Sequence, residues 1–539
     1  MAKPTARPRI PIVEIFGILF LLGIIAVVVL GMLGPAVGNV FSNITLNCCA
    51  DGYSYSALVP ATPFIGDGGY PSYGGTDPVN GEPYADVFFK DYGVNPFIDT
   101  EDDPLSTFAL DVDTGSYTIA RRYLADGYLP PAEAVRVEEF VNYFEYGEAP
   151  PVDGAFAVSL DGGPTPFVQN DRYQVIRVAI QGREIDDQER RPAVLVFVID
   201  SSGSMADGNR LGMVQASLAG LVETLGPSDR VGVVTFDSQA RVVLPVTPVG
   251  ERTAILDAIY SLRPGDSTNA ADGLGLGYQL ADRAYQPGSI NAVILCSDGV
   301  ANVGVTGASD MLAKVRSESK GGIRLTAVGF GMGNYNDVLM ERLADEGDGI
   351  YAYVDNAAEA EKVFVENLTG TLQTIAADAK VQVSFNPAVV SRYRLIGFEN
   401  RAIRDEEFLD DTVDAGEVGA GQDVTALYEV KFHDGASGEI AQVVLRWEDP
   451  DTHAVEQLTE SIATGELAMS FEATSSAFQL AVLSAEFAEI LRDSYWAQER
   501  TLGDVVPWLE RLKPIAHEDE EVWEFIRLVE RAASISGDA

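Results

Sequence analysis

Unbroken apolar runs alternate with helically spaced apolar residues between residues 191 and 375. The runs "AVLVFVI", "RVGVVTF", "NAVILCS", "RLTAVGFG" and "IYAYV" have the length of buried strands, and "RVVLPV" predicts a shorter one. Between them, segments such as "RLGMVQASLAGLVETL" repeat apolar residues at helical spacing, and Gly226-Pro227 ends that helix. Buried strands that alternate with amphipathic helices predict an α/β fold with a doubly wound, mostly parallel sheet covered on both faces.

The segments on either side of this region have a strand-rich pattern instead. "GAFAVSLDGG" and "DRYQVIRVAIQG" precede it, and "AKVQVSFNP", "VTALYEVKFH" and "EIAQVVLRWEDP" follow it. Strands on both sides predict a β-sandwich shared by the two flanks, with the α/β domain inserted between its halves. The chain then ends in predicted helices, the last of which places Val522, Phe525, Ile526 and Val529 on one apolar face.

The N-terminus has the pattern of a membrane anchor. Residues 15–33 carry no charge, and a helix of this length roughly matches a hydrocarbon core of about 30 Å. Lys3, Arg7 and Arg9 precede the apolar stretch, so the long remainder of the chain is expected outside the cytoplasm. The alternative is a cleaved signal peptide. Residues 37–86 are rich in Gly, Pro, Ser and Tyr without a period, which predicts a flexible linker.

These patterns divide the chain into predicted segments. They are a cytoplasmic stub with a transmembrane anchor (1–36), the linker (37–86), an N-terminal flanking domain with β-strands (87–190), the α/β domain (191–375), a C-terminal β-rich flanking domain (376–470) and C-terminal helices (471–539). The length of 539 residues accommodates roughly three domains of ordinary size.

Charge and composition exclude some functions. The formal net charge of −44 is spread along the chain, and such a surface repels nucleic acid, so no nucleic-acid partner is expected. The three cysteines form no disulfide framework. Cys48 and Cys49 could pair between chains or carry lipid, whereas Cys296 lies in an apolar run and is expected to be buried. The three histidines lie far apart in sequence, which argues against a histidine-based catalytic centre.

Three loops of the α/β region carry small side chains with oxygen atoms. Asp200 ends the first strand, and Ser202 and Ser204 follow at steps of two. Thr268 precedes a helix, and Asp298 follows the strand that ends near residue 297. Because ligands of such sheets bind at the carboxyl ends of the strands, these side chains are expected to meet there. A set made only of oxygens suits Mg²⁺ or Mn²⁺, with Ca²⁺ as a further alternative, and offers little to metals that prefer thiolate or imidazole.

The same residues carry a family resemblance. D-x-S-x-S at Asp200, Ser202 and Ser204, followed by Thr268 and Asp298, resembles the metal-ion-dependent adhesion site of von Willebrand factor A domains. The surrounding stretches "FVIDSSGSM", "DRVGVVTFDS", "GDSTN" and "ILCSDGVANVG" are similar to that family as well. The resemblance implies that the three hydroxyls touch the metal and that the two aspartates often act through water. It also implies that the partner protein supplies an Asp or Glu carboxylate to the cation.

Further resemblances lie outside the A domain. "STFALDVDTGSYTIARRYLADGYLPPAEAVRVEEFVNYFEYG" and "SFNPAVVSRYRLIGFENRAIRDEEFLDDTVDAGEVGAGQDVTALYEV" resemble the flanking domains of bacterial A-domain proteins of the YfbK type. "VEIFGILFLLGIIAVVVLGMLGPAVGNVFSNI" is similar to the N-terminal helix of Flp-type pilins, with Glu14 at their glutamate position. This second resemblance implies an anchor derived from a pilin helix, or one that docks beside pilin subunits.

Three stretches resemble catalytic or cofactor motifs. "DVDTGS" contains the D-T-G of aspartic proteases, which need two such aspartates, so activity would require a symmetric dimer. "DVDTGS" also resembles the start of a Ca²⁺-binding loop, but the later ligands of such a loop do not follow it. "SSGSM" lacks a nearby histidine base and the G-x-S-x-G turn of a serine hydrolase. "GFGMGN" lies late in the sheet and predicts a tight strand exit rather than a dinucleotide loop.

The patterns together favour a membrane-anchored, single-pass protein whose C-terminal part is extracytoplasmic. We expect it to mediate divalent-cation-dependent protein–protein interaction or adhesion, without catalysis. The alternative is a metal-dependent scaffold or assembly factor for an envelope or pilus complex. A remote alternative is an aspartic-type hydrolase that acts through the D-T-G segment.

Overall fold

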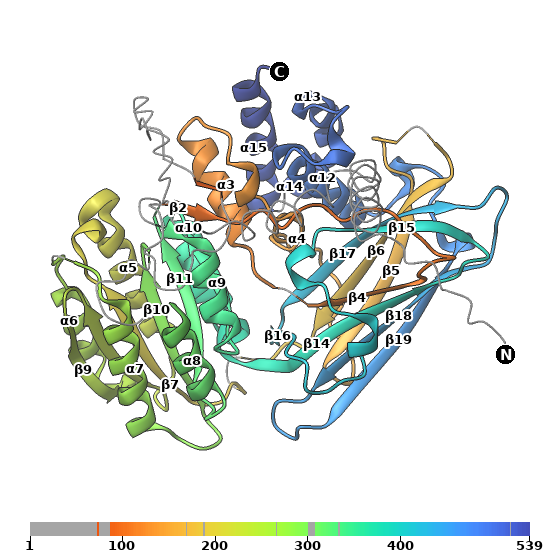
Figure 1. Cartoon of the computed structure of the whole chain (residues 1–539). Coiled ribbons are helices and arrows are strands. Elements are labelled where there is room, and N and C mark those ends of the chain that lie inside the picture. Colours follow the sequence, from red (N-terminus) through yellow and green to blue (C-terminus); the bar gives the residue numbers. More distant parts are fainter. Residues whose placement is uncertain are drawn as a thin grey trace, which may run out of the picture. The chain divides into compact units, whose positions relative to one another are not determined.

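A computed structural model describes residues 73–74, 87–110, 112–168, 170–186, 189–265, 267–299, 308–331, 335–517 and 519–538 (Figure 1). These residues belong to one compact unit, Ile65–Ala539. The predicted anchor with its pilin-like sequence, most of the linker, Cys48 and Cys49 lie outside the described residues. Among the helices that the structure does describe, none combines the length and apolar composition needed to cross a bilayer.

The A domain contains the predicted α/β sheet. Its strands are β7 (Ala193–Asp200), β8 (Arg230–Phe236), β9 (Ala240–Pro248), β10 (Ile290–Ser297), β11 (Arg324–Phe330) and β13 (Tyr351–Val354). Their order is β13-β11-β10-β7-β8-β9, and every neighbouring pair is parallel except β8 and β9. β7 and β10 are buried along their whole length, as their continuous apolar runs predict. The mostly parallel sheet is therefore confirmed.

Helices cover both faces of this sheet (Figure 1). The helices of the A domain are α5 (Arg210–Thr224), α6 (Arg252–Ser261), α7 (Ala270–Ala284), α8 (Ala308–Ser319), α9 (Asp337–Asp345), α10 (Ala357–Glu361) and α11 (Leu368–Leu372). Successive residues of a strand point to opposite faces. Val196 and Val198 accordingly share a core with α7, α8 and α9, whereas Leu195 and Phe197 share one with α5 and α6.

The last helical stretch of the A domain is interrupted. A π-helical turn, Lys362–Glu366, separates α10 from α11. This turn buries Phe364 beside Phe330 of β11. It also carries Lys362, whose ammonium lies 2.7 Å from the Glu521 carboxylate and donates to the carbonyl of Tyr143. Contacts with both flanks thus accompany the local departure from α-helical geometry.

Both flanks contribute strands to two further sheets, as the sequence predicts. One sheet has the order β3 (Ile98–Asp99), β15 (Val390–Ile396), β17 (Asp423–Phe432), β6 (Tyr173–Gly182) and β5 (Phe156–Gly163). The other contains β16 (Gly416–Gly419), β14 (Thr374–Phe385), β18 (Glu439–Glu448) and β19 (Val455–Ala463), with β4 (Leu105–Ala109) paired to β14. One core joins the two sheets through residues such as Val178, Val383 and Tyr428.

A helical part packs beside these sheets. Its helices are α3 (Gly115–Ala125), α4 (Val137–Val141), α12 (Ser476–Leu491), α13 (Leu502–Val505), α14 (Lys513–Ala516) and α15 (Glu520–Ser536). The four apolar residues predicted to share a face of the last helix are all buried in α15. The stretch "LGDVVPWLERLK" is only partly α-helical: Pro507 has no N–H to donate, and Val506–Arg511 is a 3₁₀ helix.

The A domain is inserted into the flanks at one place. Its chain enters before β7 and leaves into β14, and the backbone N–H of Arg191 donates to Oε1 of Gln373 at 3.0 Å. A short strand, β2 (Val87–Phe89), pairs in parallel with β12 (Tyr335–Asn336) and with β1 (Tyr73–Gly74). The N-terminal flank therefore also contacts the A domain directly.

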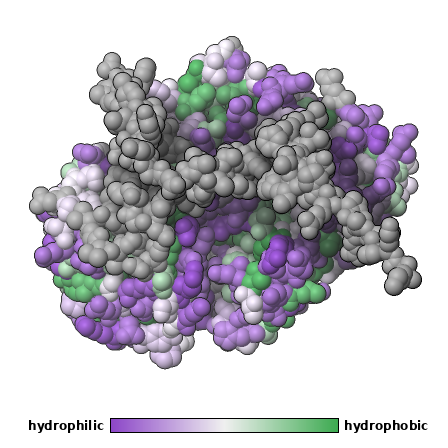
Figure 2. All heavy atoms as spheres, viewed as in Figure 1, coloured by the Kyte–Doolittle hydropathy of each residue, from purple (hydrophilic) through white to green (hydrophobic). Residues whose placement is uncertain are grey.

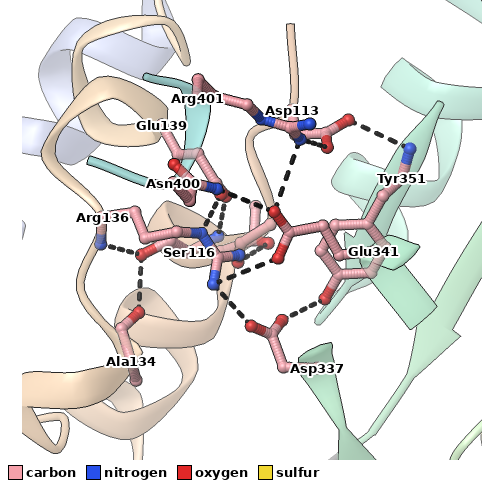
Figure 3. Close-up of polar contacts among 12 residues, drawn as sticks. Asp113, Ser116, Ala134, Arg136, Glu139, Asp337, Glu341, Tyr351, Asn400 and Arg401 are labelled. Carbon is pink, nitrogen blue, oxygen red and sulfur yellow. Dashed lines mark hydrogen bonds and ion pairs between the residues drawn. The ribbon is translucent and has the colours of Figure 1, made fainter. Parts of the chain in front are cut away.

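A buried network of charged residues joins the A domain to both flanks (Figure 3). Arg136 of the N-terminal flank pairs with Glu139 and, at 2.6 Å, with Asp337 of α9. Arg401 of the C-terminal flank pairs with Asp113 at 3.2 Å and with Glu341 of α9 at 3.4 Å. These bonds connect three segments that are far apart in sequence.

Candidate cation site

The two aspartates of the predicted site lie on neighbouring strands. Asp200 is the last residue of β7, and Asp298 directly follows β10, which pairs in parallel with β7. The chain continues from β7 to β8 on one side and later returns to β10 on the other, so the strand order reverses between β7 and β10. Open α/β sheets bind ligands at such a point. The sheet therefore brings both carboxylates to the expected edge.

The loop after β7 brings two serines to the same place. The backbone N–H of Ser202 donates to Oδ1 of Asp200 at 2.8 Å. The hydroxyl oxygens of Ser202 and Ser204 lie 3.0 Å apart, and the Ser204 hydroxyl donates to Oδ1 of Asp298 at 3.0 Å. Asp200, Ser202 and Asp298 are buried, and Ser204 is half-buried. Four of the five predicted residues thus form one connected group.

Thr268 belongs to a loop that lies against this group. The N–H of Gly265 in the same loop donates to the carbonyl of Ser201 at 2.5 Å. Thr268 itself is half-buried, and no described hydrogen bond links its hydroxyl to the other four residues. The structure places the loop beside the site without joining Thr268 to it. Parts of the neighbouring loops, Asp266 and residues 300–307, lie outside the described residues.

Two buried hydroxyls support the site and were not predicted from sequence. The Ser297 hydroxyl lies 2.7 Å from Oδ2 of Asp200 and 2.5 Å from the carbonyl of Gly299, and its single proton can serve one of them at a time. Ser201 receives a hydrogen bond from Thr235 and lies 3.0 Å from the carbonyl of Phe236. The position of Ser297 at the end of a strand, next to Asp298, is the signal that could have identified it.

Arg210 is a third residue that the sequence reasoning missed. Its Nη1 donates to Oδ2 of Asp298 at 2.6 Å and to the carbonyl of Ser204 at 3.2 Å. It opens α5, ten residues after Asp200. Nothing in the D-x-S-x-S pattern points to a basic residue at this spacing.

The acidity of the two aspartates reflects their burial. Burial raises the pKa of Asp200 to about 7, and the nearby Asp298 carboxylate adds to the rise. Burial also raises the pKa of Asp298, although Arg210 and the Ser204 hydroxyl oppose the shift. A divalent cation between them would favour the charged form of both carboxylates. Because every donor in the group is an oxygen, the residues present fit a hard cation such as Mg²⁺.

Comparisons with known proteins identify the family of this chain. The model of the von Willebrand factor type A domain matches residues 195–366, and a model described as von Willebrand factor matches residues 84–177. The model of the C-terminal part of uncharacterized protein YfbK matches residues 370–535. The uncharacterized protein YfbK of Escherichia coli (strain K12) is 34% identical over 479 residues, which cover 83% of this chain and 81% of that protein. The chain belongs to the YfbK family.

More distant relatives share only parts of this YfbK-family chain. Inter-alpha-trypsin inhibitor heavy chain H4 of Bos taurus is 27% identical over 242 residues, which span 42% of this chain and 26% of that protein. The solved structure of a von Willebrand factor type A protein from Catenulispora acidiphila is 18% identical. It covers 72% of this chain and 91% of its own, with a TM-score of 0.42. The A domain suggests protein–protein interaction or adhesion. The family models begin at residue 84, so the pilin resemblance stays a prediction.

The D-T-G segment has a structural place in this protein. Asp113 is buried, accepts a hydrogen bond from the N–H of Tyr351 at 3.0 Å and pairs with Arg401. Gly115 begins α3. The "GFGMGN" stretch coincides with the end of β11 at Phe330, and Gly331 has a left-handed φ of +78°, as a tight strand exit requires.

A second acidic group lies where the A domain meets the flanking sheets. Carboxylate oxygens of Asp378, Asp414 and Glu417 lie within 4.8 Å of one another. Burial and the neighbouring carboxylates raise the pKa of Asp414 to about 6 and hold the pKa of Glu417 well above its usual range. These residues were not predicted as a site, because they come from β14, β16 and the loop before β16.

Proposed function

We propose that this YfbK-family protein binds a partner protein through a divalent cation held at the carboxyl edge of the A-domain sheet. Asp200, Ser202, Ser204, Thr268 and Asp298 would hold the ion, which we expect to be Mg²⁺, with Mn²⁺ or Ca²⁺ as alternatives. The observation that carries the proposal is the connected group formed by the first three of these residues and Asp298. It supports binding because it assembles buried hard-oxygen donors at the ligand edge of the sheet.

The chemistry of the site suits binding of a carboxylate. When bound, the cation supplies an electrophilic centre for an oxygen of the partner. Ser202, Ser204 and Thr268 contribute neutral hydroxyls, which leave more of the cation's charge uncompensated than carboxylates would. We propose that the partner supplies an Asp or Glu side chain. No part of this role requires a proton transfer or a covalent step, so we propose binding rather than catalysis.

We further propose that the protein acts outside the cytoplasm, anchored in the membrane by residues 15–33. The uncharged apolar stretch and the basic residues before it support this placement. Alkaline extraction of membranes and protease protection of intact cells would test it. Release of the whole chain into the soluble fraction would contradict the anchor.

Metal binding by the purified full chain tests the proposed site. We expect the wild type to bind Mn²⁺, measured from the electron paramagnetic resonance signal of free Mn²⁺. Asp200→Ala and Ser202→Ala should abolish this binding or weaken it at least about tenfold. Ser238→Ala is the matched control, because this serine follows β8 at the same end of the sheet and donates only to Asp237 among the described residues.

Partner capture tests the function of the site. A pull-down from envelope extracts should retain a partner with Mg²⁺, lose it with chelator and lose it with Asp200→Ala. Partner capture that is unchanged by chelator, by Asp200→Ala and by Ser202→Ala would rule out cation-dependent binding of the partner, even if the protein binds Mn²⁺.

A further inference from the structure

Arg210 occupies a position where a basic residue is unfavourable for the helix itself. It is the first residue of α5, and the first turn contains no acidic residue. The N-terminus of a helix carries partial positive charge, so acidic residues stabilise it and basic ones do not. A basic residue at this unfavourable position indicates that Arg210 has a role outside the helix.

The chain around Arg210 is shaped to direct its side chain toward the sheet edge. Gly208 and Asn209 both have left-handed φ values, +55° and +61°, which turn the chain sharply before the helix. Across the site, Gly331 follows β11, and a Cβ at this glycine would lie 2.2 Å from Nε of Arg210. Only glycine leaves room for the guanidinium there.

The guanidinium fixes one of the two site aspartates. Its bond to Oδ2 of Asp298 is 2.6 Å long, and the side chains of Arg210 and Asp298 are 13% and 3% exposed. Oδ1 of Asp298 accepts the Ser204 hydroxyl. Both oxygens of Asp298 are therefore engaged by donors of the protein, which fixes the orientation of the carboxylate, while each oxygen keeps a second lone pair for a cation or its water.

Arg210 also sets the charge of the site. Asp200 and Asp298 are both buried, and Arg210 compensates one of them. A divalent cation would therefore leave the group with one net positive charge, whereas without Arg210 the group would be neutral. The exposed Asp207 also acts on Asp298, and its charge opposes that of Arg210. In a chain of net charge −44, a positive site is an unusual feature that would attract a carboxylate.

We propose that Arg210 is a positioning residue of the cation site: it orients Asp298 and keeps the loaded site positive, which weakens cation binding but strengthens binding of a partner carboxylate. This inference rests on the proposed function. It predicts effects of opposite sign on the cation and on the carboxylate, which a merely structural role would not produce.

The test uses the full chain, Mn²⁺ and fluoroacetate. Free Mn²⁺ measured by electron paramagnetic resonance gives the metal affinity. Broadening of the ¹⁹F signal of fluoroacetate by protein-bound Mn²⁺ gives access of a carboxylate to the ion. Arg210→Gln should bind Mn²⁺ about tenfold more tightly and fluoroacetate about fivefold more weakly than the wild type does. Arg210→Met, which keeps the aliphatic stem, should behave in the same way.

Two control variants separate the effect of the Arg210 charge from structural damage caused by the substitution. Arg210→Lys keeps the charge and should keep both affinities within about threefold of wild type. Arg241→Gln removes an exposed charge at the same end of the sheet, where Arg241 pairs with Asp237, and should change neither affinity. If both neutral Arg210 variants weaken Mn²⁺ and fluoroacetate together, or change neither, the role of Arg210 is overturned. A wild type that binds no Mn²⁺ overturns the proposed function and this inference with it.

Discussion

Several single carboxylates of this protein lie in surroundings that disfavour their charge. Asp200 at the cation site and Asp414 in the second acidic group both have raised pKa values, of about 7 and about 6. Burial is the largest cause in both, and a neighbouring carboxylate adds to it. At the cation site hydrogen bonds from Ser202 and Ser297 oppose the rise in the pKa of Asp200, whereas the second group combines three acids.

We expect Asp414→Asn to stabilise the protein above about pH 6. The folded-state pKa of about 6 lies above the unfolded value of about 3.9, so the folded protein loses stability as the pH rises between these values. Removing the carboxylate removes that loss. Because the Asp414 residue is exposed, solvent screens part of this effect, and the melting temperature at pH 8 should rise by only about 1–2 °C, with no gain at pH 4.

Melting curves of Asp414→Asn and Asp434→Asn at pH 4, 6 and 8 would check this expectation. Asp434 is exposed as Asp414 is but lies outside the acidic group, so its variant should match the wild type at each pH. A lower melting temperature of Asp414→Asn at pH 8 would show that the charged carboxylate is stabilising instead.

The packing of α7 on the sheet depends on glycines that sequence periodicity does not explain. A Cβ at Gly277 would lie 2.3 Å from Cγ2 of Val198, whereas one at Gly275 would meet only Cε of Lys314 at 4.0 Å. Gly277 is buried against β7, and Gly275 is half-buried. The two glycines of one helix thus have different roles. The close approach of α7 to β7 requires a glycine at position 277, whereas position 275 has room for a side chain.

Alanine substitutions should separate these two glycines. Alanine favours a helix over glycine by up to about 1 kcal/mol, so Gly275→Ala should be neutral or stabilising by that amount. Gly277→Ala forces α7 away from Val198 and should lower the free energy of unfolding by about 1–3 kcal/mol despite the same gain. Urea unfolding of both variants measures the difference. Equal effects would show that the helix shifts without loss.

Much of this architecture could be predicted, because the alternating pattern follows from burial of each strand and of one face of each helix. The spacing of Asp200, Ser202 and Ser204 predicted their convergence for the same local reason. Arg210 could not be predicted, since its contact with Asp298 depends on how two loops meet. The ion pair of Arg136 with Asp337 joins residues about 200 positions apart, and no periodicity encodes it.

At the scale of the whole molecule, the strong negative charge coexists with buried ion pairs between domains. Hydrophilic side chains occupy much of the coloured surface in Figure 2, and hydrophobic ones form separate small patches. The junction of the A domain with the flanks includes the ion pairs of Arg136 and Arg401 with their carboxylate partners (Figure 3). Each of these cations faces at least two acidic groups.

Arg136→Met should therefore destabilise the junction strongly. The substitution leaves the buried carboxylates of Glu139 and Asp337 without this partner, which costs about 3–5 kcal/mol when one member of a buried pair is removed. Denaturant unfolding would measure the loss. Arg404→Met, which breaks an exposed pair with Glu407, should cost far less stability than Arg136→Met. Similar losses for both variants would contradict a special role of the buried network.

The neighbouring entry and exit of the A domain make it a module that could be cut out or exchanged. Because Arg191 and Gln373 are joined by a hydrogen bond, a bridge of about three residues, reaching roughly 10 Å, should span the gap left by its removal. The shared core of the two flanking sheets contains no residue of the deleted segment, so we expect it to persist in such a truncated chain. It should yield a folded β-rich protein by circular dichroism, and another A domain grafted at the same point would inherit the same scaffold. A truncated chain that stays unfolded would show that the flanks need the A domain to fold.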